Sequence, residues 1–331
     1  MSCQQQNPSH RSSSLGLLLL LGGCSTPQSA LDPQGPAART IAQAWWVMFW
    51  GAWAVLALVM GLVLYAMFRR PQSRSSGRAF IIGGGLLLPI LTLAALLIYG
   101  TQIGNILTDR PLQPGVRVEI IGHQWWWEVR YPDAPGGEVV TANEIHIPAA
   151  RPVQLVLTSD DVIHSFWVPT LAGKLDLIPG KLTRLWIQAD VPGRYRGQCA
   201  EFCGLQHARM ALMVIAQPQA DFDHWLIRQS RTPSAPVDAL RQQGRAAFLE
   251  LGCADCHTVR GTPAGGKRGP DLTHVGSRHT LAALTLENTP DNLARWIAHN
   301  QALKPGNRMK SFDHLPQDQI AAIAAWLESL R

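Results

Sequence analysis

The chain has 331 residues, of which 47% are hydrophobic and only 16% are charged. This charge content is low for a soluble protein and points to membrane segments. The net charge is +6, but residues 1–114 hold seven basic side chains against two acidic ones, beside apolar stretches. A nucleic-acid-binding protein would concentrate such an excess on a folded domain, so the charge distribution excludes that class.

Residues 15–24 read L-G-L-L-L-L-L-G-G-C, and this apolar run is too short to span a bilayer. It is typical of the hydrophobic region of a signal peptide, which we expect over residues 1–23. Its ending resembles the lipobox of bacterial lipoproteins, which implies that Cys24 is lipidated and begins an extracytoplasmic segment over residues 24–40. The alternative is an ordinary signal peptide with an incidental cysteine.

Two longer apolar stretches, at about residues 42–68 and 79–99, can each cross a hydrocarbon core. Together they predict a transmembrane hairpin over residues 41–105, with Pro89 as a tolerable kink inside the second span. Four tryptophans near one end of the first span suit an interfacial belt: Trp45, Trp46, Trp50 and Trp53. Four arginines place the connecting loop in the cytoplasm, and therefore the rest of the chain outside it: Arg69, Arg70, Arg74 and Arg78.

Residues 115–228 alternate between short β-branched stretches and Gly-Pro turns, which predicts an antiparallel β-sandwich or barrel ending in a short helix at 221–229. Residues 229–236 are a polar linker. Residues 237–331 predict an all-α domain with amphipathic helices at 238–251, 291–300 and 317–330. The expected fold class is therefore a multi-domain membrane protein with a two-helix hairpin, a β-domain and a helical domain.

The stretch C-A-E-F-C-G-L-Q-H-A-R-M, residues 199–210, concentrates metal-binding side chains in one connection between strands. Cys199 and Cys203 alone would favour a disulfide in an oxidising compartment. Thiolate, imidazole and thioether donors together suit copper better than zinc, which rarely takes a thioether. A copper site on such a loop usually draws a further ligand from an earlier strand, and His164 in D-V-I-H-S-F is the candidate.

With its spacing C-x-E-x-C-x-x-x-H-x-x-M, this region resembles subunit II of the haem-copper cytochrome oxidases, a resemblance that covers residues 40–228. The resemblance implies a cupredoxin-like fold and a dinuclear copper A centre with two copper ions. It implies that Cys199 and Cys203 bridge the coppers, and that His164 and His207 each bind one. Met210 and the Glu201 carbonyl would be weak ligands, and the Glu201 side chain would reach a magnesium ion at the subunit I boundary.

Other motifs extend the same resemblance. In G-H-Q-W-W-W, residues 122–127, Trp125 corresponds to the family's tryptophan over the copper site, which passes electrons inward. In G-K-L-D-L-I-P-G, residues 173–180, Lys174 and Asp176 would face subunit I. One departure is Ile82, at a position where the family often has a glutamate at the mouth of a proton channel, so proton entry by that route is in doubt.

The helical domain opens with C-A-D-C-H, residues 253–257, the motif of c-type haem attachment. Cys253 and Cys256 would form thioethers to the haem, and His257 would be an axial iron ligand. A redox C-x-x-C or half a zinc site would not need the adjacent histidine. The domain resembles class I cytochromes c, which implies Met309 as the second axial ligand and the Pro270 carbonyl as the hydrogen-bond acceptor of His257. The remaining histidines of this domain are expected at the surface: His274, His279, His299 and His314.

The resemblances imply an electron-relay subunit of a proton-pumping cytochrome c oxidase in a bacterial inner membrane, with the copper and haem domains on the periplasmic side. Electrons from cytochrome c or another donor would pass through haem c and copper A to haem a in subunit I, with subunit III as a further partner. Two alternatives stay open. One is the electron-input subunit of a copper-A-type nitric-oxide reductase, and the other is a non-catalytic copper-carrying lipoprotein.

Overall fold

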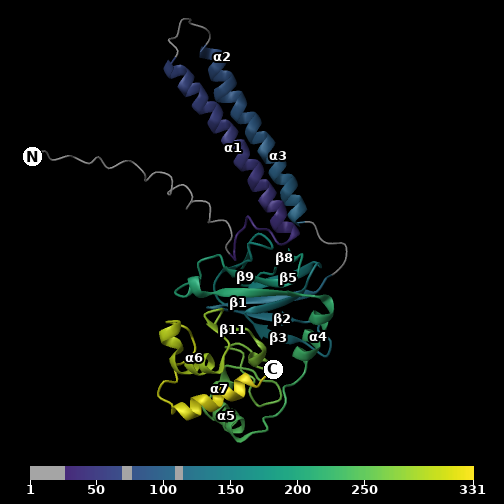
Figure 1. Ribbon diagram of the computed structural model, residues 1–331, viewed down its shortest axis with the longest axis vertical. Helices are drawn as coiled ribbons and strands as arrows, with labels where there is room; N and C mark the ends of the chain where they lie inside the picture. The colour runs from purple at the N-terminus through teal and green to yellow at the C-terminus, as the bar shows by residue number, and fades with distance from the viewer. Residues whose placement is uncertain (1–26, 69–76, 109–114) are drawn as a thin grey trace, which may run out of the picture.

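A computed structural model describes residues 27–68, 77–108 and 115–331 (Figure 1). It shows two long apolar helices, a β-sandwich and a helical C-terminal domain, which confirms the predicted fold class. The hairpin and the C-terminal domain extend from opposite sides of the sandwich (Figure 1). The predicted signal peptide, the lipidation of Cys24 and the arginines at 69, 70 and 74 lie outside the described residues and stay predictions.

Both apolar helices are long and apolar enough to cross a membrane, and their large side chains are exposed along the hairpin. The first is α1, Pro36–Phe68, and the second continues through α2, Gly77–Ile82, η2, Gly83–Leu87, and α3, Leu88–Thr108. The π-helical turn η2 lies just before Pro89, and Leu88 N donates to Gly83 O. Because Pro89 has no N–H to donate, the widened turn accommodates the helix where an α-helical hydrogen bond is missing.

The start of α1 is fastened to the sandwich by backbone hydrogen bonds. Gln34 N donates to Thr170 O at 2.7 Å, and Asp190 N donates to Gln34 O at 2.9 Å. Gly35 passes so close that a Cβ atom there would lie 2.2 Å from Gln188 O, which excludes any side chain. The segment that leads into the hairpin is therefore held to the β-domain by hydrogen bonds and close packing.

The β-domain, residues 115–228, consists of two five-stranded sheets. One has the order β3-β2-β1-β5-β8 and the other β4-β10-β9-β6-β7. The strands are β1 Arg117–His123, β2 Trp126–Tyr131, β3 Val139–Ala142, β4 Glu144–Pro148, β5 Val153–Ser159, β6 His164–Trp167, β7 Leu175–Leu177, β8 Thr183–Ile187, β9 Gly193–Cys199 and β10 Ala211–Gln217. Most neighbours are antiparallel, but β1 pairs with β5, and β4 with β10, in parallel.

Alternating side chains explain how the two sheets pack. In β1, Val118 and Ile120 are fully buried while their sequence neighbours are less so, as the two-residue period of a strand requires. The core includes the fully buried rings of Trp127 and Phe166, 6.3 Å apart edge to face. Helix α4, Gln219–Ser230, packs on the sandwich at β4, where the Trp225 ring stacks on the buried His146.

The C-terminal domain, residues 237–331, is helical, as predicted. Its elements are α5 Ala239–Glu250, η4 Cys253–Asp255, η5 Val275–Ser277, β11 Thr280–Leu281, β12 Leu286–Glu287, α6 Pro290–Leu303 and α7 Gln317–Glu328. Asp238 caps α5 by accepting from Arg241 N, and Thr289 caps α6 in the same way. The Phe248 and Trp326 rings meet edge to face at 5.0 Å between α5 and α7.

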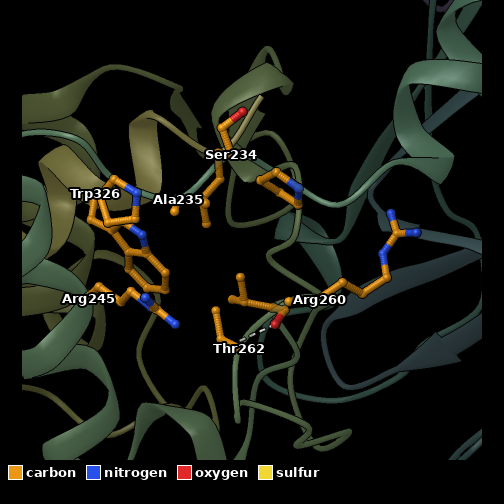
Figure 2. Close-up of a pocket in the computed structure, with 11 residues that line it drawn as sticks. Ser234, Ala235, Arg245, Arg260, Thr262 and Trp326 are labelled. Atoms are coloured by element: carbon orange, nitrogen blue, oxygen red, sulfur yellow. Dashed lines mark hydrogen bonds between the residues drawn. The ribbon is translucent and has the colours of Figure 1, made fainter.

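The linker between the two domains lies against the C-terminal domain. Arg260 donates to the carbonyls of Gln229 and Ser230, and His274 Nε2 donates to Arg231 O at 2.9 Å. Figure 2 shows the hollow that the following linker residues cross, with Ser234 on one side of it and Arg260 on the other. The predicted surface position of His274 is therefore wrong, because its ring is buried where it binds the linker.

Gly244 marks the tightest approach of two helices in the C-terminal domain. A Cβ atom there would lie 1.9 Å from the Ala322 carbonyl oxygen in α7. We predict that Gly244→Ala pushes α5 away from α7. The free energy of unfolding of this domain should fall by about 1–3 kcal/mol, the usual cost of overpacking. Thermal unfolding of the full chain, followed by circular dichroism, measures the loss. Gly265→Ala, which has open space at this position, is the control and should unfold like the unmodified chain.

Candidate metal and haem sites

The ends of three neighbouring strands lie close together at one end of the sheet. Cys199 ends β9, His164 begins β6, and Met210 immediately precedes β10. The strands β6 and β10 flank β9 on its two sides, so antiparallel pairing brings these three positions together. Cys203 and His207 lie on the loop between β9 and β10, and His207 begins the short helix η3, His207–Arg209.

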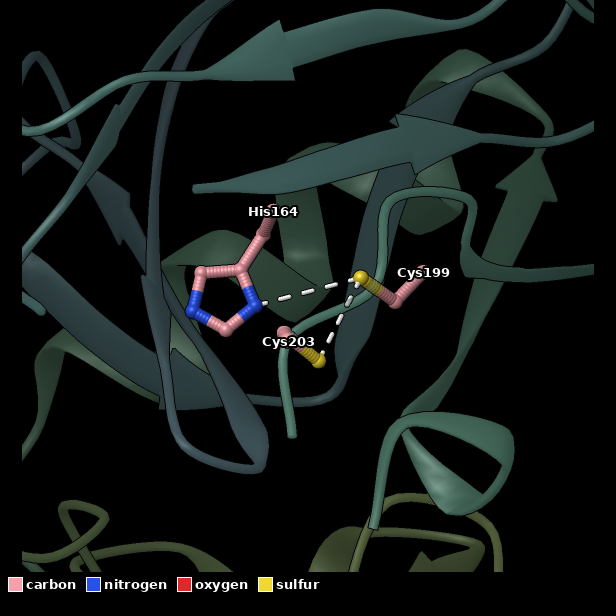
Figure 3. Close-up of side chains that lie close together, drawn as sticks. All are labelled: His164, Cys199 and Cys203. Carbon is pink, nitrogen blue, oxygen red and sulfur yellow. Dashed lines mark hydrogen bonds between the residues drawn. The ribbon is translucent and has the colours of Figure 1, made fainter. Parts of the chain in front are cut away.

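All six predicted copper donors lie within a small volume around the two sulfur atoms. The Sγ atoms of Cys199 and Cys203 are 3.8 Å apart, and both cysteines are free. Figure 3 shows the Nδ1 atom of His164 pointing at Cys199 Sγ, at 3.8 Å. His207 Nδ1 is 3.5 Å and Met210 Sδ is 3.8 Å from Cys203 Sγ, and Glu201 O is 3.2 Å from Cys199 Sγ.

The chemistry of this donor set fits copper. The Sγ–Sγ distance is far longer than a disulfide bond of about 2.05 Å, so the disulfide alternative does not describe this geometry. Ligand atoms of His164, Cys199 and Cys203 lie within 4.8 Å of one another and are buried, as a single metal centre needs. Thiolate, imidazole and thioether sulfur in one cluster favour copper over the harder divalent ions.

The thiol groups of Cys199 and Cys203 differ in acidity because they are in contact with each other. The hydrogen bond from Cys203 lowers the pKa of Cys199 to about 3, with further help from His164, while the same contact raises the pKa of Cys203. This contact therefore favours the thiolate form of Cys199 and the thiol form of Cys203. Binding of copper through both sulfur atoms would release the remaining proton.

Asp161 orients His164 and was not identified from the sequence. Its Oδ1 atom accepts from His164 Nε2 at 2.9 Å, which leaves Nδ1 facing the cysteine sulfur atoms. Asp161 is itself fixed by the backbone N–H groups of Gln124 and Val162, both at 2.7 Å. A carboxylate three residues before a candidate ligand, in D-V-I-H, is the signal that could have revealed this role.

The G-H-Q-W motif closes the other side of the cluster. Gly122 lies against the His164 ring, where a Cβ atom would come within 2.7 Å of its Cδ2 atom. Gln124 Nε2 and Trp125 Nε1 both donate to Cys203 O, at 2.8 and 2.9 Å. The indole of Trp125 therefore contacts the copper loop directly.

The cysteines of C-A-D-C-H lie in and beside η4, and His257 N donates to Cys253 O at 3.0 Å. His257 Nδ1 donates to the carbonyl of Pro270 at 2.8 Å, which leaves Nε2 free for iron. Burial lowers the pKa of His257, so the imidazole is neutral, as an iron ligand must be. Gly269 makes room for the ring, because a Cβ atom there would lie 2.6 Å from its Cε1 atom.

Met309 lies on the loop after α6, and a network of amides holds that loop. Met309 N donates to Asn307 Oδ1 at 2.9 Å, and the Met309 carbonyl accepts from Gln301 Nε2 at 2.8 Å. The fully buried Asn300 ties the same loop from both sides, through Asn307 Nδ2 at 3.0 Å and Lys310 O at 2.9 Å. These amides were not singled out in the sequence, where they resemble any polar loop.

Comparisons with known proteins match both the β-domain and the C-terminal domain. Residues 137–217 match the family model "Cytochrome C oxidase subunit II, periplasmic domain", and residues 242–331 match "Cytochrome c". The chain is 33% identical to cytochrome c oxidase subunit 2 of Alkalihalophilus pseudofirmus, over 95% of each chain. It is 27% identical to the Bacillus subtilis protein of the same name, again over 95% of each.

Among solved structures, the periplasmic domain of subunit II of cytochrome oxidase from Bradyrhizobium japonicum is 29% identical. That match covers 35% of this chain and 94% of the solved one, with a TM-score of 0.34.

Asp161→Ala should weaken copper binding roughly 10- to 100-fold, because losing the partner of a metal-binding histidine typically costs that much affinity. Copper titration of the metal-free protein against a competing chelator measures the change. Asp160→Ala is the matched control, since this neighbouring carboxylate is largely exposed and makes no contact with His164. Equal affinities for the two variants would show that Asp161 has no orienting role.

Proposed function

Because the chain belongs to the family of cytochrome c oxidase subunit 2, we propose that it relays electrons from a haem c in its C-terminal domain to a copper A centre in its β-domain, and on to haem a of the oxygen-reducing subunit. Membership of this family makes the chain a component of an oxidoreductase complex. The observation that carries the proposal is the convergence of six donor groups around the two sulfur atoms.

In this proposal Cys199 and Cys203 would hold the copper pair through their sulfur atoms, and His164 and His207 would each supply one further nitrogen ligand. Met210 and the Glu201 carbonyl lie further out as weak ligands. A copper pair bridged by two thiolates takes up and gives back one electron with little change in its ligand geometry. The strands β6, β9 and β10 support this role, because ligands at strand ends move less than ligands on a long free loop.

The outward face of the copper loop supports contact with subunit I. The Glu201 carboxylate and Lys174 are both about half exposed and pair at 3.8 Å. The Phe202 side chain beside them is 76% exposed, which is unusual for a phenylalanine and fits a surface that a partner covers. A magnesium ion at this boundary would use the Glu201 carboxylate, and Trp125 would carry electrons inward from the copper loop.

In the C-terminal domain, Cys253 and Cys256 would anchor the haem through thioether bonds. His257 and Met309 would bind its iron axially, with Pro270 orienting His257. Such a haem transfers single electrons, and a methionine ligand raises its potential. The free Nε2 atom of His257 and the tight space at Gly269 support this assignment.

The two long apolar helices support anchoring of the chain in a membrane, and the match to a periplasmic domain supports an extracytoplasmic position of the β-domain. Ile82 ends α2 with an exposed side chain, and no carboxylate occurs between Phe80 and Pro89. If the complex pumps protons, their entry therefore uses a route other than this position. Oxygen consumption by the purified complex supports the proposed function, whereas turnover of nitric oxide without oxygen consumption would assign the chain to a reductase.

Cys199→Ser should abolish copper binding at the paired site, because serine cannot bridge two coppers as a thiolate does. The wild-type complex should show a mixed-valence copper signal in its electron paramagnetic resonance spectrum, and the variant should show none. The haem absorption spectrum is the internal control and should be unchanged. A wild-type protein that binds zinc, or no metal, at this site would overturn the copper assignment.

Met309→Ala should open the sixth position of the haem iron and lower its potential by more than about 60 mV, a tenfold change in equilibrium constant for one electron. Redox titration and loss of the long-wavelength sulfur–iron absorption band measure the effect. Met213→Ala, in β10, is the matched control and should leave both unchanged. A retained sulfur–iron band in Met309→Ala would contradict the ligand assignment.

A further inference from the structure

The C-terminal domain packs on the β-domain beside the copper loop, through the segment that joins α6 to Met309. Gln206 Nε2 donates to Pro305 O at 2.6 Å, and Arg209 donates to Leu303 O. A Cβ atom on Gly306 would lie 2.7 Å from the side chain of Leu205, so the two loops are in direct contact there. The two segments that carry the proposed redox ligands therefore touch.

Lys304 is buried at the centre of this contact, with only 2% of its surface exposed. Its ammonium donates to three backbone carbonyls: Trp125 O at 2.8 Å, Arg209 O at 3.0 Å and Ala282 O at 3.2 Å. Two of these belong to the β-domain, on either side of the copper cluster, and the third belongs to its own domain. Burial removes the ammonium from water and lowers the pKa of Lys304 below its usual value.

Glu144 makes the reciprocal contact from the β-domain. It begins β4, is 2% exposed, and its Oε1 accepts from His279 N at 2.8 Å and Thr280 N at 2.9 Å. Its Oε2 accepts from His279 Nδ1 at 3.1 Å. Although burial alone would raise it, the hydrogen bonds and charge of His279 lower the pKa of Glu144 below its usual value. The carboxylate is therefore charged in the packed state, and its hydrogen bonds to His279 and Thr280 exist only while the domains are in contact.

The two buried charges favour one relative position of the domains. A charge removed from water is costly unless its hydrogen-bond partners are in place, so a shifted or rotated arrangement would leave Lys304 or Glu144 without partners. Each charge has two hydrogen bonds to main-chain groups of the other domain, whose positions are set by the fold. Such contacts add little net affinity but penalise every wrong arrangement.

We propose that Lys304 and Glu144 are positioning residues for electron transfer between the two domains, and that together they hold the Met309 loop against the copper loop. This inference rests on the proposed function. The step that they serve moves one electron, which oxidises the haem iron and reduces the copper pair, and no proton or bond moves with it. With the domains held, the rate depends on a fixed distance. Without the contacts, the linker must first bring the domains together.

The test uses the assembled complex and a ruthenium polypyridyl photoreductant that delivers one electron to the haem. In the wild type we expect electron transfer from haem to copper at a rate that does not change with solvent viscosity. Lys304→Met removes all three hydrogen bonds at similar volume. We expect it to slow the transfer at least tenfold and to make the rate fall as sucrose is added, while the haem and copper spectra and the haem potential stay the same.

Lys310→Met is the matched control, since Lys310 is an exposed lysine on the other side of Met309 and should transfer electrons like the wild type. Wild-type rates in Lys304→Met, independent of viscosity, would overturn the proposal. If Lys304→Met fails to assemble, Glu144→Gln is the alternative variant. It keeps the side-chain shape and removes the charge, and residue 144 lies outside the copper loop. It should also show slow, viscosity-dependent transfer, and an unchanged rate in it would overturn the proposal.

Hydrogen exchange separates this inference from the proposed function, because it needs neither metal nor haem chemistry. Peptides covering residues 204–212 and 278–288 should exchange faster in Lys304→Met than in Lys310→Met, since the contact protects both. If Lys304→Met exchanges faster but the wild-type complex binds no copper, the contact would be supported and the electron relay refuted. Equal exchange in the two variants would refute the contact itself.

Discussion

The candidate copper site depends on one constraint, which is that the ends of β6, β9 and β10 meet at the same end of one sheet. Antiparallel pairing places the start of β6 and the start of β10 beside the end of β9. The strands themselves therefore position His164 and Met210 on either side of Cys199. The loop after β9 then needs only a few residues to return Cys203 and His207 to the same point. Asp161, Gly122 and Trp125 close the cluster from the opposite sheet and its adjoining loops, which makes both layers of the sandwich part of the site.

A second consequence concerns the contact between the domains. The described interface is rich in hydrogen bonds to main-chain carbonyls and N–H groups, and its two most buried charges come from opposite domains. An apolar contact of the same size would tolerate sliding, because hydrophobic burial has no direction. Hydrogen bonds to fixed backbone groups do not tolerate it. The linker adds to this arrangement, since its carbonyls are held by Arg260 and His274 and it does not hang free between the domains.

The hairpin is joined to the same sandwich from the other side. The segment before α1 runs along the β-domain, and Gly35 lies where no side chain fits. One rigid β-domain therefore connects a membrane anchor on one side with the C-terminal domain on the other (Figure 1).

The sequence by itself determined the three parts of the chain and the residues that could bind metal or haem. Apolar length, strand alternation and helical periodicity are local patterns, and C-x-E-x-C-x-x-x-H-x-x-M and C-A-D-C-H are local spacings, so each can be recognised without knowing the fold. Only the tertiary structure decided which groups support them. Asp161 behind His164, the burial of His274 against the linker, and the insertion of Lys304 and Glu144 into the opposite domain join positions as much as 179 residues apart. Apart from Asp161, which lies three residues before His164, these contacts leave no periodic or spacing signal. A lysine or glutamate is ordinarily exposed, and only the packing of two complete domains removes Lys304 and Glu144 from water.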